Sequence, residues 1–224
     1  MVITCAQKIR LSHPLWGFLK CRAGLAAVET AIILPFLLLC LLAGFETVRY
    51  INMTRQMTIV ANSLASMLST RTSAAQFNDV VFAMNSTLVT FPQVLGDPAR
   101  GGTTWYQYMS LTASSILFSP TVNGCTSGCT YKAKVDWSLS SAGNTRSCSV
   151  APASASDTAA PTLATLPSDV FTAGSLIVVD ITYPFVPIFG STFFKPITFR
   201  RSAYLQPRYL AKIPLVSSSG GNCP

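Results

Sequence analysis

The stretch KCRAGLAAVETAIILPFLLLCLLAGFETVRY, from Lys20 to Tyr50, decides the fold of this chain. A short basic run ends at Gly24, and an almost uninterrupted apolar segment follows it. As a helix, the segment from Leu25 to Val48 would measure about 36 Å, at about 1.5 Å per residue. That length crosses the hydrocarbon core of a bilayer, which is about 30 Å thick. The sequence therefore predicts a transmembrane helix over residues 25–48.

A cleaved secretory signal peptide also combines a basic start with an apolar run. Its apolar region is shorter, however, and small residues mark a cleavage site at the far end. Here only Ala43-Gly44 resembles such a site. Cleavage there would release a secreted soluble protein that starts near Phe45. We favour retention of the segment as an anchor and keep the secreted protein as an alternative.

Lysine and arginine flank the apolar segment unequally. Four basic residues and no acidic residue precede it, whereas Arg49 and Arg55 follow it closely. An excess of positive charge favours the cytoplasmic side of a single span. We therefore expect residues 1–24 to form a basic cytoplasmic leader. The bulk of the chain would then lie outside the cytoplasm, in the periplasm if the source is a two-membrane bacterium, or otherwise at the cell surface.

One acidic residue, Glu29, lies about one turn into the apolar segment, and Thr30 to Phe45 carries no charge. A carboxylate inside a membrane helix costs on the order of a few kcal/mol unless it is paired or close to the interface. One interpretation places Glu29 simply at the depth of the lipid headgroups. The other interpretation gives Glu29 a positively charged partner. Its position five residues after Gly24 indicates what that partner is.

A glycine that ends a basic leader, followed by an apolar helix with glutamate in fifth position, resembles the processing site of type IV pilin-like precursors. The resemblance implies that a membrane aspartyl peptidase, the prepilin peptidase, cuts between Gly24 and Leu25. The cut would expose the positive α-amine of Leu25 at the membrane interface. Glu29 of a neighbouring subunit could neutralise that amine, because two charges that are costly separately become tolerable as a pair. Glu29 would then register the helices as they stack into a fibre.

The same region also resembles a more specific family. The segment RAGLAAVETAIILPFLLLCLLAGFE is similar to the start of the TadE-like proteins of the tight-adherence (Flp) pilus assembly system. The positions that carry this resemblance are Gly24, Ala27, Val28, Glu29, Ala31 and Pro35. Near the other end of the chain, SLIVVDITYPFVPIF and RRSAYLQPRY resemble the closing strands of such proteins.

The resemblance implies both a function and a set of partners. The chain would be a minor pilin or pseudopilin-like component of a tight-adherence pilus assembly and secretion system. It would act by helix packing and subunit contacts in the inner membrane. Its partners would be other pilus or pseudopilin subunits, inner-membrane assembly proteins and the prepilin peptidase. The alternative is an uncleaved single-span envelope protein whose periplasmic domain binds a partner or a component of the cell wall.

Beyond the span, the apolar pattern first predicts helices. Apolar side chains recur at intervals of three and four after Tyr50, so we expect the membrane helix to continue to about Ser69. The members of this stripe are Met57, Val60, Ala61, Leu64, Met67 and Leu68. A second amphipathic helix is predicted over Ala74–Leu88, and a loop rich in Pro and Gly over residues 91–104. Amphipathic helices are therefore expected over residues 49–90.

Residues 91–224 predict a β-rich extracytoplasmic domain, and the fold class is α+β with an antiparallel sheet. The strand patterns are YMSLTASSILFS, TYKAKVDWSLS, SLIVVDITYPFV and ITFRRSAYLQ. Alternation in the second of these places Ala133 and Trp137 on a buried face and Ser138 on the solvent face. Ser149–Ser168, rich in Ala, Ser and Pro, is predicted to be a flexible surface excursion. The resemblance adds the pilin-like plan, in which the long N-terminal helix lies on a small sheet.

The seven cysteines divide according to the predicted compartments. Cys5 and Cys21 precede the span, and Cys40 lies inside it. The four cysteines that follow the span are Cys125, Cys129, Cys148 and Cys223. In an oxidising space these four allow two disulfides with three alternative pairings. One pairing closes the short loop CTSGC and joins Cys148 to the C-terminal tail. Their spacing fits neither a zinc site nor a two-residue redox motif, so we predict structural disulfides and no metal.

The remaining chemistry of the chain indicates no enzyme. The single histidine, His13, lies in the leader, which removes histidine-based catalysis from the exterior domain. Asp136 and Asp180 lie in predicted strands and could form a glycosidase pair, but solvated or strand-edge positions explain them more simply. We therefore predict no catalytic residue and no cofactor. The net charge of +8 comes from scattered basic residues, a pattern that argues against nucleic-acid binding.

Overall fold

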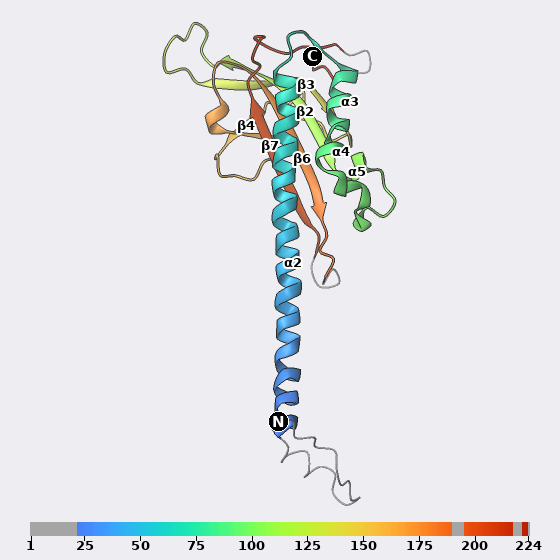
Figure 1. The fold of residues 1–224 in the computed structure, drawn as a ribbon. Coiled ribbons are helices and arrows are strands. Elements are labelled where there is room, and N and C mark those ends of the chain that lie inside the picture. Colours follow the sequence, from blue (N-terminus) through green and yellow to red (C-terminus); the bar gives the residue numbers. More distant parts are fainter. Residues whose placement is uncertain (1–21, 190–194, 217–220, 224) are drawn as a thin grey trace, which may run out of the picture. The chain divides into compact units, whose positions relative to one another are not determined.

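The computed structural model describes residues 22–189, 195–216 and 221–223. The chain divides into two compact units, Met1–Arg49 and Tyr50–Pro224. Helix α2, Arg22–Ser69, contributes to both units (Figure 1). Its end at Ser69 confirms that the helix continues well beyond the apolar segment. Most of the predicted leader, with Cys5, His13 and Cys21, lies outside the described residues.

The first unit contains the apolar part of α2. Its side chains are exposed around the helix, and they include Ile32, Leu34, Phe36, Leu37 and Leu41. Pro35 lies inside the helix without ending it. The helix is long and apolar enough to cross a membrane, and none of its most apolar stretch is buried inside the protein. So large an apolar surface needs lipid or other helices around it, and α2 is therefore a candidate membrane span.

In the second unit, α2 buries a single stripe of side chains. The buried residues are Met53, Met57, Val60, Ala61, Leu64, Ala65 and Leu68. They form rows in steps of four along the helix, as one face of a helix requires. Met67 lies off these rows and is 46% exposed, so its predicted place in the stripe is wrong. Its sulfur instead accepts a hydrogen bond from the Ser86 hydroxyl at 3.7 Å.

A four-stranded antiparallel sheet forms the body of the second unit, which confirms the α+β class. The strands are β2 (Ser110–Pro120), β3 (Tyr131–Ser140), β6 (Gly174–Phe185) and β7 (Ile197–Leu205). They are ordered β3-β2-β6-β7. The main core lies between one face of this sheet and the helices, and a smaller apolar cluster lies on the other face.

Short elements complete the second unit. The helical ones are α3 (Phe77–Asn85), α4 (Thr87–Thr90), α5 (Trp105–Tyr108), η1 (Pro92–Gly96), η2 (Pro98–Arg100) and η3 (Ser168–Val170). The paired strands are β1 (Ala75–Gln76) with β8 (Leu215–Val216), and β4 (Ala153–Ala155) with β5 (Thr165–Pro167). The helix predicted over Ala74–Leu88 is shorter because Ala75 and Gln76 pair with β8.

Helix α3 begins at a capping interaction that its sequence explains. The Asp79 carboxylate accepts the backbone N–H of Gln76 at 3.0 Å and pairs with the Arg71 guanidinium at 2.8 Å. The backbone hydrogen bond and the arginine together lower the pKa of Asp79. A carboxylate at the third position of a helix also complements the partial positive charge of the helix start.

A bulge in β3 corrects one part of the predicted alternation. The register between β2 and β3 shifts at Asp136, and an extra residue in a strand reverses the facing of the residues that follow it. Trp137 therefore joins the core on the helix side, whereas Ala133 lies in the cluster on the opposite face. Ser138, predicted on the solvent face, is buried and shares a hydrogen bond of 2.9 Å with Ser114.

The C-terminal tail covers the outer edge of β3. The Ser138 amide donates to the carbonyl of Gly221 at 2.8 Å, and the Cys223 amide donates to the carbonyl of Asp136 at 2.9 Å. Disulfides join Cys148 to Cys223 and Cys125 to Cys129, which is one of the three pairings left open by the sequence. The paired tail blocks an edge that could otherwise pair with another strand.

The two disulfides should contribute unequally to stability. Cys148 and Cys223 are 75 residues apart in sequence, whereas Cys125 and Cys129 are four apart. The loop-entropy model gives about 4.5 kcal/mol for the long loop and about 2 kcal/mol for the short one. We expect the double serine variant of the 148–223 pair to lower the free energy of unfolding more than that of the 125–129 pair. Urea unfolding of the full chain in detergent, followed by tryptophan fluorescence, measures both losses. Equal losses would contradict the prediction.

Candidate functional site

The residues predicted for processing and helix registration lie at the start of α2. The Gly24–Leu25 bond falls in the first turn of the helix, and Glu29 follows about one turn later with its side chain exposed. The next acidic residue along the helix is Glu46. The stretch between the two glutamates is apolar and exposed, so the Glu29 carboxylate stands in apolar surroundings on the helix surface.

Four ion pairs occur in the described part of the chain. They join Arg49 to Glu46, Arg71 to Asp79, Arg146 to Asp180 and Lys212 to Asp136. Glu46 is thus paired one turn away on its own helix, at 3.0 Å. Glu29 takes part in none of these four pairs.

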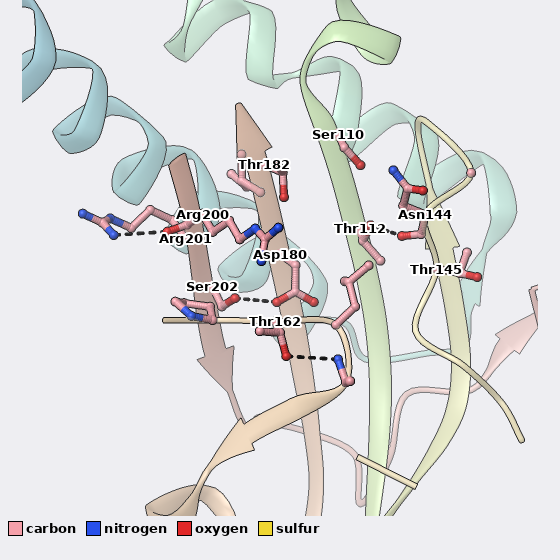
Figure 2. Close-up of a pocket in the computed structure, with 15 residues that line it drawn as sticks. Ser110, Thr112, Asn144, Thr145, Thr162, Asp180, Thr182, Arg200, Arg201 and Ser202 are labelled. Atoms are coloured by element: carbon pink, nitrogen blue, oxygen red, sulfur yellow. Dashed lines mark hydrogen bonds between the residues drawn. The ribbon is translucent and has the colours of Figure 1, made fainter. Parts of the chain in front are cut away.

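The second unit carries a polar pocket of about 600 Å³ on the sheet face away from α2 (Figure 2). The strand register arranges its floor in two rows across β2, β6 and β7. The outer row is Ser110, Thr182 and Arg200, and the inner row is Thr112, Asp180 and Ser202. Residues 143–145 and 161–164 form its walls. Its lining includes six serine or threonine residues, two arginines and the Asp180 carboxylate.

A buried ion pair closes the inner side of this pocket. The Arg146 side chain is completely buried, and its guanidinium binds the Asp180 carboxylate through Nε at 2.8 Å and Nη2 at 2.9 Å. Its other N–H groups donate to the carbonyls of Thr162, Leu163 and Thr165. All five guanidinium donors are therefore used, the condition under which a buried arginine is tolerated.

The position of Asp180 corrects our simpler interpretation of the strand carboxylates. Asp180 lies in the central strand β6, is nearly buried, and also accepts a hydrogen bond from the Ser202 hydroxyl. Asp136 lies on β3 and binds Lys212 at 3.1 Å. Each carboxylate is held by its own cation, so neither offers the free acid or base of a glycosidase pair. Asp180 is neither solvated nor at a strand edge.

The segment predicted as a flexible excursion forms the outer wall of the pocket. It contributes β4 and β5 and buries Leu166 against the sheet. The Asp157 carboxylate accepts the backbone N–H of Asp169 at 3.2 Å and the Ser168 hydroxyl at 3.1 Å. These hydrogen bonds lower the pKa of Asp157 and fasten the far end of the segment. This polar segment adopts a defined conformation because Arg146 donates hydrogen bonds to three of its backbone carbonyls.

An aromatic cluster lies where α2 enters the second unit. The Tyr50 ring packs edge-on against Phe199 and Phe185, with centroids 4.8 and 6.0 Å away. Next to it, the Tyr108 hydroxyl donates to the carbonyl of Pro184 at 2.9 Å. Burial, with a smaller effect of the Asp97 charge, raises the pKa of Tyr108 to about 12. The phenol therefore stays a hydrogen-bond donor throughout the physiological pH range.

Comparison with known families supports the resemblance seen in the sequence. The family model described as TadE-like protein matches residues 24–65. The N-terminal segment is TadE-like. The match begins at Gly24, includes Glu29 and ends inside the stripe that packs on the sheet. Comparison with curated proteins and with solved structures finds no match.

The TadE-like segment implies involvement in tight-adherence pilus assembly, a structural and assembly role. Its boundaries take in both the apolar half of α2 and most of the packed half. The match thus covers both the candidate membrane span and most of the part of the helix that packs on the sheet. Processing at Gly24–Leu25 and registration by Glu29 stay predictions.

The sequence did not reveal the buried arginine of the second unit. Arg146 lies in a polar stretch with no periodic pattern, and only the fold brings it to Asp180. One signal was available, because Asp180 interrupts the apolar run LIVVDIT. A carboxylate in the middle of a buried strand requires a cation or several donors.

Removing the guanidinium of Arg146 should destabilise the second unit strongly. Arg146→Met leaves Asp180 as an uncompensated buried charge, which costs about 3–5 kcal/mol. The matched control is Lys212→Met, because that pair is surface-exposed and such pairs contribute at most about 1 kcal/mol. Urea unfolding of the full chain in detergent measures both losses. A loss for Arg146→Met no larger than that of the control would refute the buried-pair interpretation.

Proposed function

We propose that the chain is a minor pilin or pseudopilin-like subunit of a tight-adherence pilus assembly and secretion system. The observation that carries the proposal is the position of Glu29, the first acidic residue of α2. Glu29 lies in an apolar, exposed helix, outside every ion pair of the described residues. The TadE-like match over residues 24–65 supports it.

The mechanism we propose is a pairing between neighbouring subunits. Cleavage after Gly24 would give Leu25 a positive α-amine at the membrane interface. The Glu29 carboxylate of the next subunit would neutralise this amine, and the uncharged surfaces from Thr30 to Phe45 would pack in register. Each charge alone is costly in lipid, so the paired arrangement is favoured over unregistered stacking.

The proposed location follows from the same segment. The chain would cross the inner membrane once, with residues 1–24 in the cytoplasm and the second unit in the periplasm or in the pilus. The basic leader favours this direction. The partners would be other pilus or pseudopilin subunits, inner-membrane assembly proteins and the prepilin peptidase.

The proposal requires a mature N-terminus at Leu25. Mass spectrometry of the protein purified from cells that carry the pilus machinery should find a chain that begins there. A chain that still begins at Met1 would favour the uncleaved single-span envelope protein. A chain that begins near Phe45 would favour the secreted protein.

Replacing Glu29 should impair assembly and leave insertion intact. Glu29→Gln keeps the shape of the side chain and removes its charge, so the pairing with the neighbouring α-amine is lost. We expect at least about a tenfold drop in sheared surface fibres, the factor that corresponds to about 1.4 kcal/mol per contact. Carbonate extraction should still find the variant in the membrane fraction.

Two controls sharpen this experiment. Glu29→Asp keeps the charge and should retain most of the fibres. Glu46→Gln removes a carboxylate from the same helix that already pairs with Arg49 in its own chain, and it should retain them as well. Fibre yields at the wild-type level for Glu29→Gln would count against the registration role.

A further inference from the structure

The β6–β7 end of the sheet lies beside Tyr50, the first residue of the second unit. In the second unit, α2 runs alongside β7: the rings of Tyr50 and Phe199 lie 4.8 Å apart at one end. At the other end, the Arg208 amide donates to the carbonyl of Ser69 at 2.9 Å. The described residues that follow β6 and precede β7, 186–189 and 195–196, therefore lie at the Tyr50 end of the unit. Tyr50 follows Val48, the last residue of the predicted span, by about 3 Å along the helix axis.

This end of the sheet is apolar and exposed. Ile188 is 52% exposed, Phe189 42% and Ile197 46%. We call these three residues, with Lys195, the β6–β7 tip. Lys195, two residues before Ile197 in sequence, is also exposed and carries a positive charge. The described residues of the β2–β3 turn, at the opposite end of the sheet, are mostly polar, apart from the exposed Val122.

The base of the β6–β7 tip is held in place on the second unit. The Phe185 and Phe199 rings contact each other at 5.5 Å, and both contact Tyr50. The Tyr108 hydroxyl holds the carbonyl of Pro184, one residue earlier on β6. The height of the tip relative to Tyr50 is therefore set by packing. From Phe185, the chain to Ile188 reaches at most about 10 Å farther.

We propose that the β6–β7 tip inserts into the lipid interface of the bilayer that α2 crosses. Tyrosine is enriched at that interface, exposed apolar side chains gain by leaving water there, and a neighbouring lysine suits anionic headgroups. The tip would give the second unit a second attachment to the membrane and fix its tilt. The inference rests on the membrane span alone and is independent of the pilin role.

Nitroxide accessibility in lipid nanodiscs tests the proposal. The full chain carries one free thiol at a time, with the other unpaired cysteines replaced by serine, in discs of phosphatidylethanolamine and phosphatidylglycerol. A label at Ile188→Cys or Ile197→Cys should be more accessible to oxygen than to a water-soluble nickel complex. A label at Val122→Cys, an exposed apolar position at the far end of the sheet, should show the reverse.

Two further labels make each outcome decisive. Gln206→Cys lies just beyond the end of β7 that is farther from the tip, and its label should be accessible to the nickel complex. Comparing this label with the one at 197 shows whether lipid exposure decreases along β7 away from the tip. The native Cys40 reports the span itself and should be oxygen-accessible. Nickel accessibility at 188 and 197 with Cys40 in lipid would overturn the tip proposal alone. Protection from both reagents that depends on protein concentration would also overturn it, because it would place a second copy on the tip.

Discussion

One helix must satisfy two environments, and the rest of the structure depends on how it does so. Before Tyr50 the apolar side chains of α2 surround the whole circumference, whereas after Tyr50 they are confined to a stripe. A helix that is apolar all round needs lipid or other helices, and a striped helix needs one partner surface. The second unit supplies that surface as a sheet. The change in pattern along one continuous helix thus marks where the candidate membrane span ends and the folded domain begins.

The two faces of the sheet and its outer edge are each covered in a different way. Its helix-facing side is filled by the main core, which includes Trp137 and Tyr183. Its other side is covered by a polar segment with few apolar residues, so apolar burial alone holds it weakly. Arg146 compensates, because one buried guanidinium ties Asp180 on the sheet to three carbonyls of the covering segment. The outer edge of β3 is closed in turn by the C-terminal tail and its disulfide.

Periodic patterns made most of the fold predictable. The end of α2, the four long strands and the α+β class follow from apolar spacing, which reports local geometry directly. The errors occur where tertiary pairing overrides local pattern. Ala75 and Gln76 join β8 and shorten the second helix, and the bulge at Asp136 turns Ser138 inward. The ion pair of Arg146 could not be predicted from local pattern because its partner, Asp180, lies 34 positions away in sequence.

Two independent features of the chain support the same direction of insertion. The positive charge before the apolar segment favours a cytoplasmic leader. In the second unit, Cys125, Cys129, Cys148 and Cys223 are all joined in disulfides, and such bonds persist in oxidising compartments outside the cytoplasm. Among the described cysteines only Cys40, inside the apolar helix, is free. Charge bias acts on membrane insertion, whereas disulfides depend on the redox environment, so the two arguments are independent. Both fit the periplasmic location that we propose for the second unit.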